Sequence, residues 1–322
     1  MPKLAALRLT DPRLWQILSL ASLLAYGTVF LGFDVTPARA ALIVGTVLAA
    51  QLAGTVAARL PAYDPWSALI SAFSLCLLLR TNAPLVAAFA AAAAIGSKFL
   101  LRFHGKHLFN PTNFALVLAI AVTGDAWVSP GQWGSAAFFA FLLACAGRFV
   151  VQRAARGDVT LAYLATSFLL VVGRSLQLHE PPAIPLHRLE SGALLLFAFF
   201  MISDPKTTPD SRVGRIIFGA LVATGAAYVQ FRLFRPNGAL WSLALFSLFV
   251  PLFDLIWPGR RALPAAGATP FPQPPKGDFR ATILRLRLDA RPRPLPLGRT
   301  PSRAGGPRLL RLLRRESRHE AL

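Results

Sequence analysis

The polar stretch Asp204-Pro205-Lys206-Thr207 interrupts two long apolar runs, residues 193–202 before it and residues 216–229 after it. Proline cannot donate a backbone hydrogen bond, and it keeps the preceding residue out of the helical conformation. The chain must therefore leave helical geometry where two apolar segments meet, and its free backbone groups need polar partners there. A carboxylate, an ammonium group and a hydroxyl lie beside this break. The stretch predicts a broken helix near Pro205 and a polar ligand site that includes Asp204 and Thr207.

A second segment of the same character is Phe109-Asn110-Pro111-Thr112-Asn113-Phe114. Its polar side chains open another apolar run, and the simplest interpretation is that they cap a helix. Two amides on either side of a proline also offer donors and acceptors in a fixed frame, which suits the edge of a flat heteroaromatic ring. We therefore expect a second break near Pro111 and a ligand site that includes Asn110, Thr112 and Asn113.

Lys98 lies at the end of the apolar run that precedes this segment. Its ammonium group could extend to the membrane interface, as lysines near the ends of spans commonly do. Alternatively, it faces an anionic or electron-accepting ligand, and for this reason Lys98 joins the candidate cofactor-binding residues.

Hydrophobic residues make up 55% of the 322 residues and charged residues only 15%, against roughly 25% charged residues in soluble domains. The excess lies in long apolar runs, which predict an all-α, polytopic integral membrane protein. We expect ten spans, at about residues 14–33, 40–58, 66–80, 84–101, 111–124, 133–151, 159–174, 190–203, 213–231 and 238–257. The third and the fifth are shorter than the ~20 residues that a full span needs, so we expect them to be tilted, broken or re-entrant. Buried helices of a soluble protein are the alternative, but ten successive runs with short links argue against it.

Lysine and arginine alternate between the links that join these spans. The N-terminus and the later even-numbered links are rich in them, whereas the odd-numbered links are poorer. Cytoplasmic loops of membrane proteins carry such an excess of positive residues. The pattern therefore predicts a multi-pass protein with its N and C termini in the cytoplasm.

The chain divides into three expected parts: a cytoplasmic N-terminus (1–13), a membrane domain (14–257) and a basic tail (258–322). The tail is rich in proline and arginine, with 15 Lys or Arg against 4 Asp or Glu. This composition is typical of a disordered segment, although residues 307–315 could form a basic amphipathic helix on anionic lipid. No folded basic module accompanies the tail, so we do not expect nucleic acid as a partner.

Several kinds of chemistry find no support in the sequence. Cys76 and Cys145 lie in separate runs, whereas an iron–sulfur centre needs four thiolates. His104 and His107 are three residues apart but have no nearby carboxylate or cysteine as a further ligand, so we expect structural histidines and no metal site. There is also no phosphate-binding glycine loop and no Ser–His–Asp arrangement. If the protein carries out chemistry, it does so through a bound cofactor and not by hydrolysis.

Three acidic residues need an explanation beside these apolar runs. Asp158 opens the seventh span in Gly157-Asp158-Val159-Thr160, where a helix cap is the simplest interpretation. Asp254, in Pro251-Leu252-Phe253-Asp254, is either an interfacial acid or the partner of a loop cation. Asp204 follows the end of a helix, whose dipole disfavours a carboxylate, so a compensating cation from the same link is expected.

Four stretches of the chain resemble the membrane subunits RnfD and NqrB of the Rnf and Na⁺-translocating NADH:quinone oxidoreductase complexes. Together they cover roughly residues 14–257, and the string Phe-Phe-Met-x-x-Asp-Pro is the most specific of them. They are Ser97-Lys98-Phe99 through Phe109-Asn110-Pro111, then Gly157-Asp158-Val159-Thr160-Leu161-Ala162, then Phe199-Phe200-Met201-Ile202-Ser203-Asp204-Pro205-Lys206-Thr207, and Pro251-Leu252-Phe253-Asp254.

The resemblance implies a ten-helix fold in two related halves, in a bacterial plasma (inner) membrane, and flavin as the cofactor. It implies that Asn110, Thr112 and Asn113 match the region that contacts non-covalent riboflavin, and that residues 204–207 match the family's Asp-Pro-x-Thr break. Family members also carry FMN esterified to the threonine of a Ser-Gly-Ala-Thr motif. Here residues 121–156 contain only Thr123 without that motif, and Ser-Gly-Ala at 191–193 is followed by Leu194. We therefore expect no covalent FMN, and the chain resembles a divergent RnfD-like branch.

The expected function is that of a membrane subunit in flavin-linked electron transport, with coupling to ion translocation as an open question. Other membrane or redox subunits and a quinone are the expected partners. Two alternatives remain open on the same architecture: a solute or ion transporter, and a membrane scaffold without a cofactor.

Overall fold

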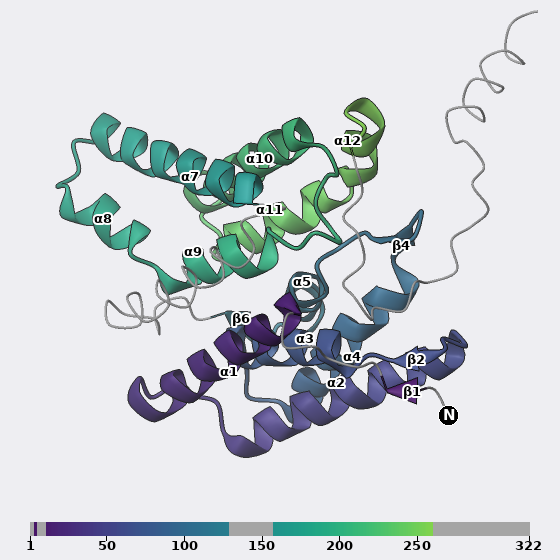
Figure 1. Ribbon diagram of the computed structural model, residues 1–322. Coiled ribbons are helices and arrows are strands. Elements are labelled where there is room, and N and C mark those ends of the chain that lie inside the picture. Colours follow the sequence, from purple (N-terminus) through teal and green to yellow (C-terminus); the bar gives the residue numbers. More distant parts are fainter. Residues whose placement is uncertain (1–2, 5–10, 129–156, 260–322) are drawn as a thin grey trace, which may run out of the picture. The chain divides into compact units, whose positions relative to one another are not determined.

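The computed structural model of the protein describes residues 3–4, 11–128 and 157–259 (Figure 1). Most of these residues form helices, which confirms a helical membrane protein as the fold class. The predicted sixth span (133–151) and the predicted tail beyond residue 259 lie outside the described residues.

The helices of residues 12–123 all begin with proline. They are α1 (Pro12–Phe30), α2 (Pro37–Ala57), α3 (Pro65–Leu78), α4 (Pro84–Leu100) and α5 (Pro111–Thr123). Proline suits the first helical position because the backbone donor that it lacks would find no partner in the helix there. Side-chain oxygens of the preceding residue cap four of the five helices: Asp11, Thr36, Asp64 and Asn110. The sequence motif of a polar residue followed by proline therefore fixes where these helices start.

Short extended segments continue the two shortest of these helices. Strand β3 (Leu79–Thr81) follows α3, and β6 (Ala126–Val128) follows α5, and the two pair in antiparallel register with Arg80 opposite Trp127. The Arg80 side chain is buried, and its guanidinium donates to the carbonyl oxygens of Cys76 and Leu77 at 3.0 and 3.2 Å. The ladder and the arginine satisfy backbone groups that helices of this length leave open.

Two further strand pairs are equally short. Strand β1 (Lys3–Leu4) pairs in parallel with β2 (Ala62–Tyr63), and β4 (Arg102–Phe103) forms an antiparallel hairpin with β5 (Lys106–His107). The β4–β5 hairpin connects α4 to α5, and it presents Lys106 to the later part of the chain.

Two bent helix pairs characterise residues 157–259. The elements are α7 (Gly157–Gln177), α8 (Ala183–Leu189), α9 (Gly192–Leu196), the π-helix η2 (Phe197–Met201), α10 (Arg212–Phe231), α11 (Gly238–Ser247) and α12 (Val250–Ile256). The chain bends by 42° between α8 and the continuous α9–η2 segment, and by 53° between α11 and α12. Pro251 accounts for the second bend, because its ring would clash with the carbonyl of Ser247 in a continuous helix.

The breaks therefore differ in position from those predicted. Pro111 begins α5 and interrupts no helix, whereas Pro205 lies in the non-helical link between η2 and α10. The helix interruptions lie instead at residues 190–191 and 248–249. The chain does leave helical geometry at both prolines, but there it separates two helices and does not bend one.

The described residues confirm only part of the ten spans predicted. Three described helices, α2, α7 and α10, are long and apolar enough to cross a membrane, and the count rises to five if each bent pair is one span. Helices α3, α4 and α5 are apolar but only 13–17 residues long. Within the described part of the chain, a helical membrane protein is shown and ten complete spans are not.

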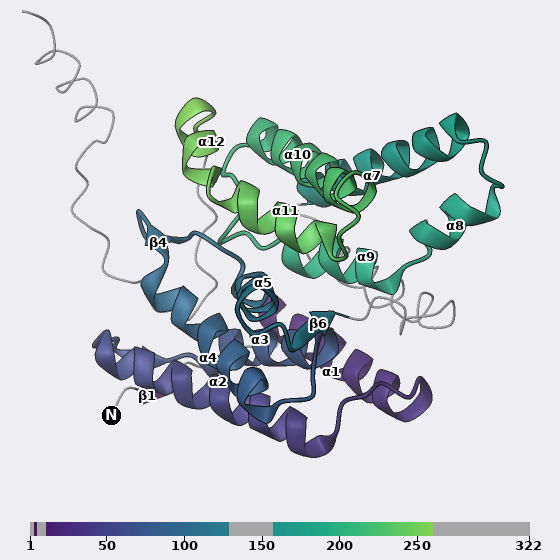
Figure 2. The same cartoon turned by 180° about the vertical axis from the view of Figure 1, so that it is seen from behind.

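Helices α7 and α10 lie side by side (Figure 2). Gly219 of α10 allows their backbones to approach closely, since a Cβ atom at this position would lie 2.7 Å from the carbonyl oxygen of Val159 and 3.2 Å from Ala162 Cβ. Small residues permit such contacts between membrane helices.

We predict that Gly219→Ala destabilises the protein by about 1–3 kcal/mol, because the added methyl group meets backbone that cannot move aside. Gly45→Ala is the matched control, since a Cβ atom at Gly45 in α2 meets nothing within 4 Å. The control should leave stability unchanged or raise it by up to ~1 kcal/mol through helix propensity. Thermal unfolding in detergent, followed by circular dichroism, measures both. Equal behaviour of the two variants would contradict close packing at Gly219.

Candidate functional site

Lys106 binds two carboxylates that are far away in the sequence. Its Nζ atom lies 3.1 Å from Asp210 Oδ1 and 2.8 Å from Asp254 Oδ2. The backbone amide of Asp210 also donates to Asp254 Oδ1 at 2.6 Å. The β4–β5 hairpin, the link before α10 and helix α12 are thereby joined at one point. Of the two interpretations of Asp254, the structure confirms the partner of a loop cation.

Arg215 extends this cluster to the start of α7. Its Nε and Nη2 atoms donate to both carboxylate oxygens of Asp158, at 2.7 and 2.6 Å, and its Nη1 donates to the Asp210 carbonyl oxygen at 2.7 Å. Such a two-pronged contact is the strong form of an arginine–carboxylate pair. Asp158 does lie in the first turn of α7, as predicted, but its main partner is this arginine. We call Lys106, Asp158, Asp210, Arg215 and Asp254 the ion cluster.

The asparagines of the second polar segment bind backbone carbonyls. Asn110 Oδ1 accepts from the amide of Asn113 at 3.1 Å, which confirms Asn110 as a helix cap. Asn110 Nδ2 donates to the Met201 carbonyl oxygen at 3.3 Å, and Asn113 Nδ2 donates to that of Leu240 at 3.2 Å. The first contact reaches the π-helix and the second reaches α11. Both side chains are buried, and so is Thr112 next to them.

One buried acceptor in this group has no hydrogen-bond partner among the described residues: Asn113 Oδ1. Buried polar atoms are almost always hydrogen-bonded, and leaving one unpaired costs roughly 1–3 kcal/mol. An N–H group of a ligand would satisfy this oxygen.

Lys98 lies inside the protein. It is only 6% exposed, and its Nζ atom donates to the carbonyl oxygen of Ser67 at 2.8 Å and to the Ser67 hydroxyl at 3.3 Å. The interpretation of a side chain that extends to the membrane surface is therefore wrong. The lysine instead joins α4 to the first turn of α3.

The stretch that contains Asp204 folds into a turn that satisfies its own groups. Asp204 Oδ1 accepts from the Lys206 amide at 3.0 Å, and the Asp204 carbonyl oxygen accepts from the hydroxyls of Thr207 and Thr208 at 3.3 and 3.1 Å. The expected cation partner is absent within the described part of the chain, where Asp204 forms no ion pair. Arg215, a cation near the same link, binds Asp158 instead.

Positive charge surrounds His107 in the β4–β5 hairpin. Burial lowers its pKa well below the ordinary value, and the charges of Lys206, Arg102 and Lys98 lower it further. The imidazole is therefore neutral at pH 7, and its Nδ1 atom has no hydrogen-bond partner among the described residues. No group of three metal-ligating side chains occurs in residues 3–4, 11–128 and 157–259.

Sequence reasoning thus found Asp158, Asp254 and the two asparagines but missed the pairing of Lys106 with Asp210. Lys106 lies within the first of the stretches that resemble the family, yet nothing in its sequence neighbourhood points to residues more than 100 positions away. The structure brings segments of all four family-like stretches together through the ion cluster and the asparagine contacts.

Comparison with known proteins agrees with that resemblance. The model of the NQR2, RnfD, RnfE family matches residues 121–261. The D component of the ion-translocating oxidoreductase complex of Cronobacter sakazakii is 30% identical over 154 residues, which are 47% of this chain and 41% of that protein. The component of the same name from Escherichia coli K12 is 31% identical over 129 residues, or 40% of this chain and 32% of that protein. The alignments thus span less than half the length of these relatives.

Three of the four stretches that carry the resemblance fall within the matched residues, including the one with Phe199-Phe200-Met201 and Asp204-Pro205. The comparisons therefore confirm the similarity of this chain to the NQR2, RnfD, RnfE family over residues 121–261.

Proposed function

We propose that the chain is a membrane subunit of a flavin-linked electron-transport complex similar to the ion-translocating oxidoreductases. The ion cluster carries this proposal, because it joins three of the four stretches that resemble the family. The family match and the two relatives from ion-translocating oxidoreductase complexes support the same function. Other membrane subunits would then be its partners, and a quinone is a candidate electron acceptor.

We further propose ten spans in two related halves with both termini in the cytoplasm of a bacterial inner membrane. The alternation of lysine and arginine between links supports the orientation. In this topology the ion cluster, the β4–β5 hairpin and Asp204 lie toward the cytoplasmic side, where positive charge is expected.

The flavin would bind without a covalent bond beside Asn110, Thr112 and Asn113. The unpaired Asn113 Oδ1 fits a ring N–H donor. Asp204 and Thr207 would line this site from the turn that their own hydrogen bonds stabilise. A flavin supplies one- and two-electron transfer, while the protein supplies position and electrostatics.

A transporter on the same architecture is the second candidate. The bends of 42° and 53° in the two helix pairs favour it, since interrupted helices form the substrate sites of many transporters. The visible absorbance of flavin in the purified protein distinguishes the two functions.

Asn113→Leu is predicted to weaken flavin binding at least about tenfold, because it removes the acceptor for the ring N–H, a loss of roughly 1–3 kcal/mol. Asn82→Leu, at an exposed asparagine, is the matched control and should bind as the wild type does. Flavin content is measured by visible absorbance after expression with added riboflavin. Folded wild-type protein without flavin would refute the electron-transfer proposal and favour the transporter.

The absence of the Ser-Gly-Ala-Thr threonine predicts that no flavin stays attached after denaturation. The protein should give no fluorescent band at its own mass in a denaturing gel, whereas a covalent flavoprotein run alongside should fluoresce. A fluorescent band would show a different attachment residue and overturn this expectation.

Lys106→Gln is predicted to lower the free energy of unfolding by about 1–3 kcal/mol, because it leaves two partly buried carboxylates without their cation. Lys206→Gln removes the same charge from an exposed lysine that forms no ion pair with described residues, and it should have little effect. Combining Lys106→Gln with Asp254→Asn should restore part of the loss in thermal unfolding. Additive losses in the double variant would mean that the two side chains do not interact.

A further inference from the structure

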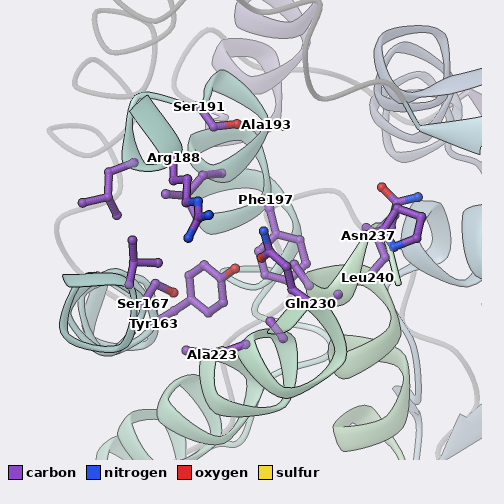
Figure 3. A pocket seen from close by; sticks show the side chains of 18 of the residues that line it. Tyr163, Ser167, Arg188, Ser191, Ala193, Phe197, Ala223, Gln230, Asn237 and Leu240 are labelled. Atoms are coloured by element: carbon purple, nitrogen blue, oxygen red, sulfur yellow. The ribbon is translucent and has the colours of Figure 1, made fainter. Parts of the chain in front are cut away.

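A cavity of about 400 Å³ lies between α7, the α8–η2 segment, α10 and α11. Its walls are mostly apolar, with Leu170, Leu194, Phe197 and Phe231 among them. Figure 3 shows Arg188, Tyr163 and Gln230 directed toward a common space. Cavities of this size and lining are typical of sites for small amphipathic molecules.

Arg188 has an incomplete set of partners in this cavity. Its Nη1 atom is buried and has no hydrogen-bond partner among the described residues. The nearest carboxylate oxygen, Glu180 Oε2, is 3.7 Å away, which is too far for a hydrogen bond. Glu180 is already engaged by Arg174 at 3.2 Å and by the Ser175 hydroxyl at 2.6 Å.

The local charge balance is positive. Two guanidinium groups share one carboxylate, and both stack over the Phe231 ring, with Arg174 at 4.5 Å and Arg188 at 5.5 Å from its centroid. The hydrogen bond from Ser175 and the charges of the two arginines keep the pKa of Glu180 below its ordinary value, so this acid is ionised at pH 7. Arg174, Arg188 and Glu180 together therefore carry a net charge of one positive unit at the edge of an apolar cavity.

We propose that this cavity binds an anionic amphiphile, whose carboxylate or phosphate pairs with Arg188 and whose hydrocarbon part lies against the apolar walls. A guanidinium presents its donors in a fixed fork that matches both anions, and the unpaired Nη1 is one of these donors. The surrounding membrane contains molecules of this chemistry, either as phospholipids or as free fatty acids. The site uses no side chain of the proposed flavin site, so it stands independently of flavin binding.

The test uses the full-length protein purified in detergent and native mass spectrometry. Dioleoylphosphatidylglycerol, oleate and dioleoylphosphatidylcholine are added separately at matched concentrations. We expect the first, the second or both to bind at least tenfold more tightly than the zwitterionic lipid, and the better of the two identifies the natural source. Arg188→Gln should abolish this preference, whereas Arg235→Gln should keep it, because Arg235 is exposed and does not line the cavity.

A second variant separates loss of binding from loss of folding. Ala227→Phe places a ring in the cavity and leaves Arg188 intact, so it should also block the anionic ligands. Thermal unfolding in detergent, followed by circular dichroism, measures the folded state of all variants independently of flavin. Equal binding of the three lipids, or unchanged preference in both Arg188→Gln and Ala227→Phe, would refute the proposal. So would arginine-dependent binding of a neutral quinone in place of the anions.

Discussion

The ammonium group of Lys106, placed between Asp210 and Asp254, is the contact on which the arrangement of the polar segments depends. This contact joins the β4–β5 hairpin, the link before α10 and helix α12. Arg215 adds the start of α7 through its ion pair with Asp158. Carboxylates at the edge of apolar helices are costly unless cations neutralise them. Each carboxylate here has such a cation, and the backbone amide of Asp210 supplies a further donor.

The second constraint is the need to satisfy backbone groups wherever a helix stops short. Asn110 and Asn113 reach the carbonyls of the π-helix and of α11, and Arg80 covers the end of α3. The β3–β6 ladder does the same where two short helices end. In an apolar environment no water replaces these partners, so irregular backbone is stable only when the protein itself pairs it.

The two proposed ligand sites differ in their chemistry. Beside Asn113 the unpaired atom is an acceptor, which fits a ring N–H group. In the cavity near Arg188 the unpaired atom is a charged donor, which fits an anion. Met201 and Leu240 contribute to both regions. Their carbonyl oxygens accept hydrogen bonds from the two asparagines, and both residues also line the cavity.

Local sequence rules determined the helical membrane class, the starts of the helices and the cap at Asn110. They act over a few residues: proline restricts its neighbours, and a polar side chain caps the next turn. Tertiary structure alone decided that Lys98 is buried, that Asp254 pairs with Lys106 across 148 positions, and that the bends lie at residues 190–191 and 248–249. These features depend on which distant segments pack together, and a single sequence carries no local signal for such pairings.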